Sequence, residues 1–257
     1  MKLADKIAII TGSESGIGQA VAVEFAKEGA DVAVTYLHDR AGAEATKRLV
    51  EGEGRRALIV QTDVREAAQV AQLFEETEQQ LGTPFILVND AGVDAVGDEV
   101  AEMTLQDWDD RIKTNLYGPF YCCQLFIRAR RKAGGEGKII NITSVHEDIP
   151  RAGAAGYCAS KGALRNLTRT LTLELAPDKI NVNNIAPGMV LTPMNQPALD
   201  DPKVLHEQVQ SIPWKRAAEP WEVAKLALYL ASEDAAYASG QTFTLDGGLS
   251  VNQGQGA

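Results

Sequence analysis

The chain has 257 residues, of which 45% are hydrophobic and 23% charged, and this is enough to bury a substantial core in one α/β domain or in two smaller ones. Its formal net charge of −10 at pH 7 argues against a nucleic-acid or anionic-membrane partner. The three cysteines show no CxxC spacing, and the N-terminal stretch has the features of neither a signal peptide nor a membrane span, so we expect a cytoplasmic protein with free thiols and no metal site.

Seven short apolar runs, rich in β-branched residues, have the composition of strands that are covered on both faces. They occupy residues 6–10, 31–36, 56–61, 85–89, 138–143, 180–186 and 241–245. The longer segments between them have helical periodicity, as at 19–29 and 68–82, and each of these two ends in a glycine that is suited to stop a helix. The alternation predicts parallel βαβ units. Because no change in composition marks a linker, we expect a single domain over residues 1–257.

One segment departs from the alternation. The chain from Pro187 to about Pro220 is rich in proline and irregular in pattern. A long irregular segment of this kind is more typical of an active-site cover than of a strand–helix unit. We therefore expect a substrate lid at about residues 188–220.

The first strand runs into a glycine-rich turn with the sequence TGSESGIG, at residues 11–18. Gly12 permits a tight turn, while Gly16 and Gly18 let the backbone approach a phosphate and let the next helix pack closely. The N-terminus of that helix offers N–H groups and a partial positive charge to a pyrophosphate. The spacing is GxxxGxG and not the dinucleotide fingerprint GxGxxG, so the motif alone is also compatible with an ordinary turn.

Two further polar sites follow the third and fourth strands. Asp63 comes directly after the third strand, where its carboxylate could accept a hydrogen bond from an adenine amino group. Asn89 ends the fourth strand, and Ala91 and Gly92 leave room for a ribose. Each is an ordinary turn former when taken alone. Because open α/β sheets bind ligands at the carboxyl ends of their strands, three such features on one sheet favour a nucleotide site.

Tyr157 and Lys161 lie four residues apart in a segment with helical spacing, so they share one face of a helix. A free phenol has a pKa of about 10, and lowering it by about 3 units requires roughly 4 kcal/mol of differential stabilisation. A nearby ammonium and an oxidised nicotinamide would both favour the phenolate, which could then take a proton from an alcohol. Ser144, at the end of the fifth strand, could hold the substrate oxygen. An isolated YxxxK pair would more simply be a half-exposed helix pair.

These motifs, together with PGMVLTP at 187–193 and DGG at 246–248, make the chain similar to the short-chain dehydrogenase/reductase family along nearly its whole length. The resemblance implies an α/β fold: a single Rossmann-type, doubly wound domain with a seven-stranded parallel sheet flanked by helices. It also implies a nicotinamide cofactor, NAD or NADP, no metal requirement and a homotetramer.

Ser144, Tyr157 and Lys161 match the family's catalytic serine, tyrosine and lysine. Asn115 matches its catalytic asparagine, which helps to hold a water on a proton relay with the lysine; without the resemblance, Asn115 could equally cap or bend a helix. Asp90 departs from the family, which usually has a second asparagine there. Since that asparagine is mainly tied to holding the sheet, we expect an effect on local stability more than on chemistry.

The pattern and the resemblance together predict a cofactor site. It comprises Gly12, Ser15, Gly16, Ile17, Gly18, Tyr36, Leu37, Asp63, Val64, Asn89, Ala91, Gly92, Tyr157, Lys161, Pro187, Gly188, Val190 and Thr192. Enzymes that use NAD usually carry an acid at the end of the second strand, and here that end is Tyr36 with Leu37 next. Glu14 argues against a 2′-phosphate, whereas His38 and Arg40 could attract one. We expect use of both coenzymes with a slight preference for NAD.

Three further stretches, SVHEDIP at 144–150, TPMN at 192–195 and SIPWKR at 211–216, resemble the bacterial glucose 1-dehydrogenase branch of the family. In that branch the C1 hydroxyl of a sugar is oxidised to a lactone. Ser144, His146 and Glu147, with Asn195 on the expected lid, are therefore predicted to bind an aldose. His146 and Glu147 could equally be a solvated loop pair.

Two other functions compete with an aldose dehydrogenase. A carbonyl reductase of the same family, with a 3-oxoacyl-carrier-protein, polyol or ketone substrate, would use the same catalytic residues. A non-catalytic nucleotide-binding protein could share the fold, but it would be free to lose the four catalytic residues, and all four are present.

Overall fold

One sheet of seven parallel strands runs through the computed structural model, which describes residues 1–94 and 97–252. The strands are β1 (Ile7–Thr11), β2 (Asp31–Tyr36), β3 (Ala57–Gln61), β4 (Ile86–Asn89), β5 (Gly137–Ile142), β6 (Ile180–Pro187) and β7 (Thr242–Leu245). Their order is β3-β2-β1-β4-β5-β6-β7, and every neighbouring pair is parallel. The predicted doubly wound α/β fold is confirmed, and each strand lies within a residue or so of its expected bounds.

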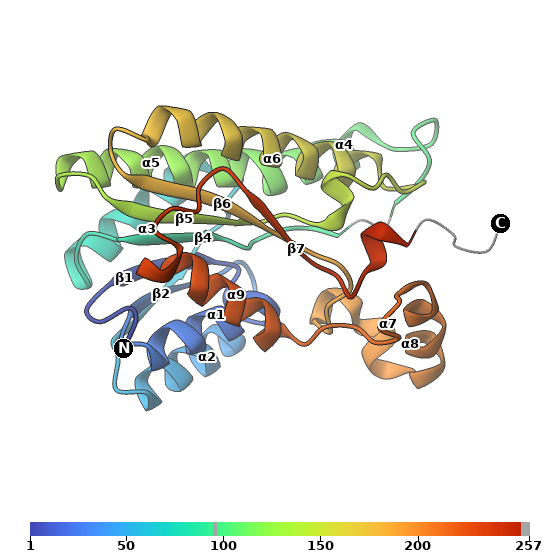
Figure 1. Ribbon diagram of the computed structural model, residues 1–257, viewed down its shortest axis with the longest axis horizontal. Coiled ribbons are helices and arrows are strands. Elements are labelled where there is room, and N and C mark those ends of the chain that lie inside the picture. The colour runs from blue at the N-terminus through green and yellow to red at the C-terminus, as the bar shows by residue number, and fades with distance from the viewer. Residues whose placement is uncertain (95–96, 253–257) are drawn as a thin grey trace.

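Helices cover both faces of the sheet, as Figure 1 shows. They are α1 (Gly16–Lys27), α2 (Arg40–Gly52), α3 (Ala67–Gln80), α4 (Leu105–Ile112), α5 (Gly118–Lys132), α6 (Ala155–Leu175), α7 (Gln196–Asp200), α8 (Pro202–Gln208) and α9 (Pro220–Ala231). The helices α1, α2 and α9 pack on one face, and α3, α5 and α6 pack on the other. Because both faces are covered, β2 and β5 are buried at every residue, which explains their continuous apolar runs.

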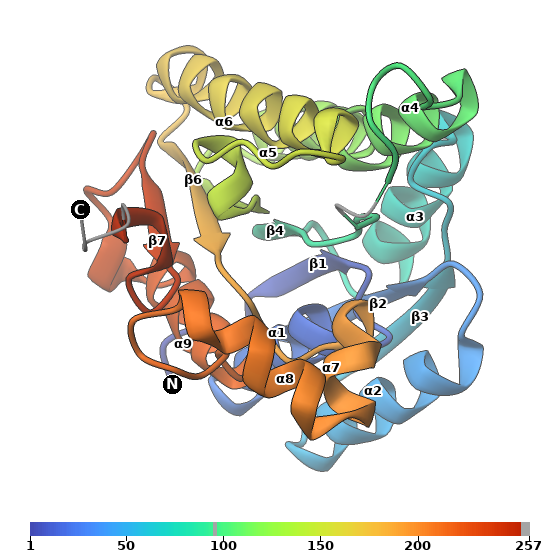
Figure 2. The ribbon, with the colours of Figure 1, turned by 90° about the vertical axis from the view of Figure 1, so that its right-hand side faces the viewer.

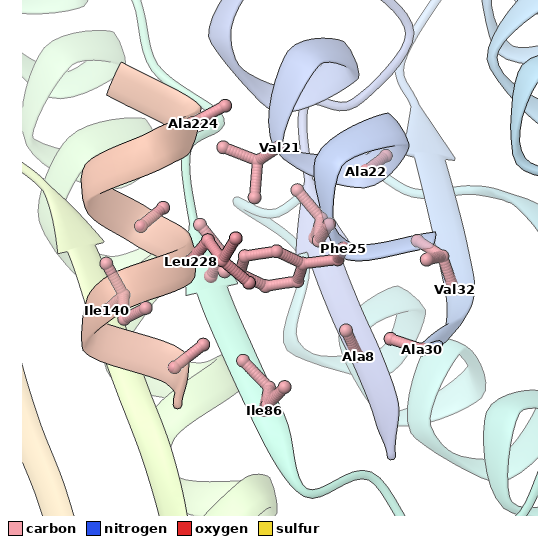
Figure 3. Close-up of a cluster of buried hydrophobic side chains, with 14 of the residues drawn as sticks. Ala8, Val21, Ala22, Phe25, Ala30, Val32, Ile86, Ile140, Ala224 and Leu228 are labelled. Atoms are coloured by element: carbon pink, nitrogen blue, oxygen red, sulfur yellow. The ribbon is translucent and has the colours of Figure 1, made fainter. Parts of the chain in front are cut away.

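The larger core lies between the sheet and the pair α1 and α9. Phe25 of α1 is fully buried there and faces Leu228 of α9, with Ile86 and Ile140 of the sheet beneath (Figure 3). This core fixes α1 against the sheet, and α1 begins at the glycine-rich loop. The position of that loop therefore depends on ordinary apolar packing some distance from it.

The sheet changes direction between β1 and β4. From β1 the chain first builds outward through β2 and β3, and then returns to place β4 on the other side of β1. The loops that follow β1 and β4 separate at this point and leave a crevice, which is where doubly wound sheets bind ligands. Gly12, after β1, approaches Ala91, after β4, so closely that a Cβ on Gly12 would lie 2.8 Å from the Ala91 Cα.

The segment predicted as a lid lies outside the sheet. It contains the short helices α7 and α8, which lie together at the right of Figure 1 and nearest the viewer in Figure 2. A small cluster of Val209, Ile212 and Ala217 holds the segment together. Among the helices of the described residues, none is long and apolar enough to cross a bilayer.

Candidate active site

A cavity of about 700 Å³ opens where the carboxyl ends of the strands meet. Most of the predicted residues line it: Gly12, Ser15, Gly16, Ile17, Tyr36, Leu37, Asp63, Val64, Ala91, Gly92, Ser144, Tyr157, Lys161, Pro187, Gly188, Val190, Thr192 and Asn195. Five predicted residues are not part of its lining, namely Gly18, Asn89, Asn115, His146 and Glu147. The tertiary structure therefore brings together residues from six strand ends and from α6.

The glycine-rich loop forms one wall of this cavity. Gly12 and Gly16 have positive φ angles of 67° and 56°, which favour glycine. Gly18 lies behind the loop, since a Cβ there would come within 2.5 Å of the Gly12 carbonyl oxygen. Ser15 precedes the first turn of α1, and its side chain makes no capping hydrogen bond. The N–H groups at the start of α1 thus border the cavity, in an arrangement that suits a phosphate.

Ser144, Tyr157 and Lys161 form a second part of the wall. Ser144 follows β5 and is buried, and its Oγ accepts a hydrogen bond from the backbone N–H of His146 at 3.2 Å. Tyr157 and Lys161 lie one turn apart near the start of α6, as the spacing predicted, with the Lys161 Nζ 5.5 Å from the centroid of the Tyr157 ring. The three side chains come from two separate elements and face one cavity.

The charges of these groups are strongly affected by burial. Burial lowers the pKa of Lys161 to about 8, although the carboxylates of Asp90 and Glu147 act in the opposite direction. The Lys161 Nζ donates to the carbonyl oxygen of Ile142 at 2.9 Å. An amine with this pKa is still mostly protonated at neutral pH, but it can release a proton far more easily than an exposed lysine.

The pKa of Tyr157 differs from the expectation. Burial raises it above its usual value, and only a hydrogen bond with Ser144 acts to lower it. We expected Lys161 to lower it, but the ammonium is held at the Ile142 carbonyl and is itself partly neutralised by burial. Desolvation of the phenolate therefore outweighs the neighbouring charge.

Asn115 holds the loop after β4 in place. It is fully buried within a π-helical turn, Lys113–Tyr117, between α4 and α5, a type of distortion that is frequent at functional sites. Its side chain accepts a hydrogen bond from the Val93 N–H at 2.9 Å and lies 3.3 Å from the Val93 carbonyl and from Ser160 Oγ. A Cβ on Gly92 would lie 3.2 Å from the Asn115 Oδ1 and 3.8 Å from the Lys161 Nζ, so glycine keeps the space between them open.

Asn89 and Asp90 have different roles from those that we expected. Asn89 points into the sheet, where its Nδ2 donates to Asn141 at 2.7 Å, and Asn141 donates to Thr168 on α6 at 2.8 Å. Asn89 thus ties strands together and does not line the cavity. Asp90 does line it, and burial raises the pKa of its carboxyl group to about 7. The departure from the family at residue 90 therefore places an acid beside Lys161, and the sheet keeps its own amide network.

The predicted sugar-binding residues do not all lie at the cavity. The Glu147 carboxylate is almost fully buried and lies 3.4 Å from the Arg165 Nε, away from the cavity lining. This position argues against its predicted role, because the short helical turn after Ser144 directs the side chain into the protein. His146 is also absent from the lining, and its Nδ1 bonds to the Ile149 carbonyl at 2.9 Å. Of the four predicted sugar-binding residues, only Ser144 and Asn195 line the cavity. The Asn195 Nδ2 donates to the Val190 carbonyl at 2.7 Å.

Several lining residues were not predicted from the sequence. Arg65 holds the Asp63 carboxylate with hydrogen bonds of 2.7–3.1 Å and also bonds to Asp110 at 3.1 Å. These bonds lower the pKa of Asp63 and occupy the oxygens that we expected to meet an adenine. The position of Arg65, two residues after Asp63 in the sequence, could have indicated that the two side chains pair. Asp94, Thr114 and Met194 also line the cavity, but they come from loops and turns whose position no local pattern reveals.

The fold and this cavity define a class of protein: a doubly wound α/β protein with a glycine-rich loop, and with a serine, a tyrosine and a lysine that line one cavity at the ends of its strands. Comparison with known proteins agrees. A family model described as enoyl-(acyl carrier protein) reductase matches residues 11–250. The chain belongs to the short-chain dehydrogenase/reductase family and is an oxidoreductase, which confirms the resemblance found in the sequence.

Its relatives differ in the substrates that their names give. The chain is 41% identical to the uncharacterized oxidoreductase YohF of Escherichia coli (strain K12), over 95% of each chain. It is 36% identical to glucose 1-dehydrogenase 2 of Bacillus subtilis (strain 168), over 98% of each. Among solved structures, acetoin dehydrogenase from Enterobacter cloacae matches with a TM-score of 0.90 and 38% identity, over 98% of each chain.

Proposed function

We propose that this chain is an NAD(P)-dependent oxidoreductase that oxidises the C1 hydroxyl of an aldose, such as glucose, to a lactone. One observation carries the proposal: a single cavity is bordered by the glycine-rich loop and by Ser144, Tyr157 and Lys161. Hydride transfer to a dinucleotide, coupled to removal of a hydroxyl proton, needs a phosphate-binding element and a proton-accepting group at one cavity.

The residues of the cavity fit a nicotinamide dinucleotide. The loop at Gly12 and Gly16 has no side chains where they would meet Ala91 or Thr192, and the N-terminus of α1 supplies N–H groups for a pyrophosphate. Gly92, Val190 and Thr192 line the same cavity, and Gly92 lies next to Lys161. When bound, the coenzyme supplies the hydride acceptor and, in its oxidised form, a positive charge. We expect both NAD and NADP to bind, with a preference for NAD.

The transfer of the substrate's hydroxyl proton is assigned to side chains of the protein. The Ser144 Oγ holds the substrate oxygen, and Tyr157, in its deprotonated phenolate form, accepts the proton that this oxygen loses. Burial by itself disfavours the phenolate, so the positive charge of an oxidised coenzyme would have to favour it. Lys161, with a pKa of about 8, can pass a proton onward near neutral pH. Asn115 acts as a positioning residue, because it fixes Val93 and leaves the space at Gly92 next to Lys161 open.

The support for an aldose comes from the cavity and from one relative. Ser144, Asn195 and Asp94 are polar groups that line the cavity and can bond to sugar hydroxyls. The relative is glucose 1-dehydrogenase 2 of Bacillus subtilis, which covers 98% of the chain. The segment at about 188–220 covers the bound substrate in this proposal, since Thr192, Met194 and Asn195 already line the cavity.

A small α-hydroxyketone is the second candidate substrate, with the reaction at its hydroxyl or its carbonyl group. It is favoured by the position of Glu147, which removes a carboxylate from the expected sugar site, and by Met194, which adds an apolar group to the lining. The solved acetoin dehydrogenase from Enterobacter cloacae, at 38% identity, points the same way. Acetoin has fewer hydroxyl groups to satisfy than an aldose.

A substrate panel tests both candidates. Purified protein is given glucose, galactose, xylose, acetoin, a polyol and a ketoester with each coenzyme, and reduced coenzyme is followed by its near-ultraviolet absorbance. The Tyr157→Phe variant is the matched control for contaminating activity. Lactone formed from an aldose at a higher kcat/KM than any other oxidation supports the first candidate. Faster turnover of acetoin than of every aldose replaces it by the second, and turnover of a polyol or ketoester alone would contradict both.

A homotetramer forms part of the proposal. Large apolar side chains are exposed at α4 and α5, among them Leu105, Trp108 and Phe120, and others lie near α9, including Trp221 and Tyr237. Two separate exposed apolar regions on one chain suit an assembly in which each subunit makes two different interfaces. Light scattering on the purified protein should give about 110 kDa, four times the chain mass of 27.6 kDa. A mass near that of one chain would contradict this assembly.

A further inference from the structure

The end of the cavity near β2 contains an acid that does not come from β2. Glu14 belongs to the glycine-rich loop and lines the cavity together with Tyr36, Leu37 and His38. Its carboxylate lies close enough to the backbone of Leu37, the residue that follows β2, for that N–H group to act against the rise that burial causes in the pKa of Glu14. Its Oε2 is buried and has no hydrogen-bond partner. A buried carboxylate oxygen without a partner is costly. The Glu147 oxygens are also without a partner, but they lie beside Arg165 and outside the cavity lining, whereas Glu14 lines the cavity, where a ligand could supply the missing bond.

The loop that carries Glu14 is fixed to β2 by several bonds. The Gly12 N–H donates to the Thr35 Oγ1 at 3.0 Å, and the Ser13 N–H donates to the Thr35 carbonyl at 3.1 Å. The Thr35 N–H in turn donates to the Ser13 Oγ at 3.0 Å. The backbone next to Glu14 is therefore fixed at β2, near the strand end where dinucleotide-binding folds place the acid that holds the adenosine ribose.

The cationic groups in this part of the cavity do not offset the acid. Arg65 lines the cavity, but its guanidinium is held by Asp63 and Asp110. Arg40, which the sequence offered as a partner for a phosphate, lies outside the cavity lining and 3.6 Å from Glu44. His38 lines the cavity as a single imidazole. A dianionic group here would meet Glu14 without a matched cation.

We propose that Glu14 is the residue that determines coenzyme specificity, by accepting a hydrogen bond from the adenosine ribose and repelling a 2′-phosphate. The proposal rests on the proposed function, because it requires that a nicotinamide dinucleotide occupies the cavity. It assigns the preference for NAD to the first loop, although the sequence at the end of β2, Tyr36 followed by Leu37, has no acid.

Direct binding tests the assignment without any substrate. The dissociation constants of NAD⁺ and NADP⁺ are measured by titration calorimetry for the wild-type chain and for Glu14→Gln, which removes the charge and keeps the shape. Glu53→Gln, an exposed acid at the end of α2, is the control for net charge. We expect Glu14→Gln to tighten NADP⁺ by about tenfold and to change NAD⁺ by less than about threefold. Raising the salt concentration should bring the dissociation constants of NAD⁺ and NADP⁺ closer together in the wild type, but not in Glu14→Gln, because salt screens the charge that the variant lacks.

The possible failures are distinguishable. If the wild type binds NADP⁺ more tightly than NAD⁺, or if Glu14→Gln changes both coenzymes equally or neither, Glu14 does not set the specificity, while the oxidoreductase function stands. If Glu53→Gln has the same effect as Glu14→Gln, the cause is net charge and the assignment is wrong. If the wild type binds neither coenzyme, both the proposed function and this assignment are refuted. A melting temperature for each variant shows whether a lost binding signal reflects unfolding.

Discussion

Replacing Lys161 by methionine should make the coenzyme-free chain more stable while it abolishes turnover. Burial lowers the pKa of Lys161 from 10.5 to about 8, so its charged form is disfavoured by about 2.5 pKa units, or about 3 kcal/mol. Methionine has a similar length and carries no charge. The variant loses the bond from Nζ to the Ile142 carbonyl, worth about 1 kcal/mol. Asp90, with a pKa of about 7, can take up a proton when its positive neighbour is gone.

The net gain in the free energy of unfolding is then about 1–2 kcal/mol at pH 7, or roughly 3–6 °C in melting temperature for a chain of this size. The assay is thermal unfolding at one protein concentration, with Lys203→Met on the exposed surface of α8 as the control. The difference between wild type and variant should depend on pH. A lysine with a lowered folded pKa destabilises the fold fully below pH 8, and this penalty disappears as the pH rises toward 10.5.

The gap between the two proteins should therefore close between pH 8 and pH 10.5. A variant that melts below the wild type at pH 7, or a gap that stays constant with pH, would refute the reasoning. In that case the ammonium would be well solvated or paired in the folded chain. The expected exchange of activity for stability is the usual consequence of keeping a buried charge for function.

Three further predictions concern single side chains. Tyr157→Phe should lower kcat by about two to four powers of ten in steady-state assays and leave the coenzyme dissociation constant unchanged, and a variant that keeps a tenth of the activity would exclude Tyr157 as the proton acceptor. Phe25→Ala should reduce the free energy of unfolding in urea by about 3–5 kcal/mol, since the ring is fully buried between α1 and α9; a loss below about 1 kcal/mol would mean that the core collapses around the cavity. Glu147→Gln should change the KM of the best substrate less than about twofold, because its carboxylate faces Arg165, and a tenfold rise would place it in the substrate site after all.

Local sequence was sufficient for the elements and for much of the site. Strand positions followed from short β-branched runs, because strands covered on both faces must be apolar at nearly every residue. The four-residue spacing of Tyr157 and Lys161 predicted that they share one face of a helix. The glycines at 12 and 16 predicted a tight turn, and both have the positive φ angles that favour glycine. These features depend only on residues that are near one another in the chain. They were enough to predict the fold, the family and most of the residues that line the cavity.

Tertiary packing decided the direction of side chains and their charge. Asn89 and Asp90 are adjacent in sequence, yet one bonds into the sheet and the other lines the cavity. Glu147 follows Ser144 by three residues but lies against Arg165, and burial shifts the pKa values of Tyr157 and Lys161 away from what a helical pair in water would show. Glu14 comes to the end of β2 only because the first loop is bonded to Thr35. Desolvation and long-range contacts depend on every element around a group, and no local pattern in the sequence records them.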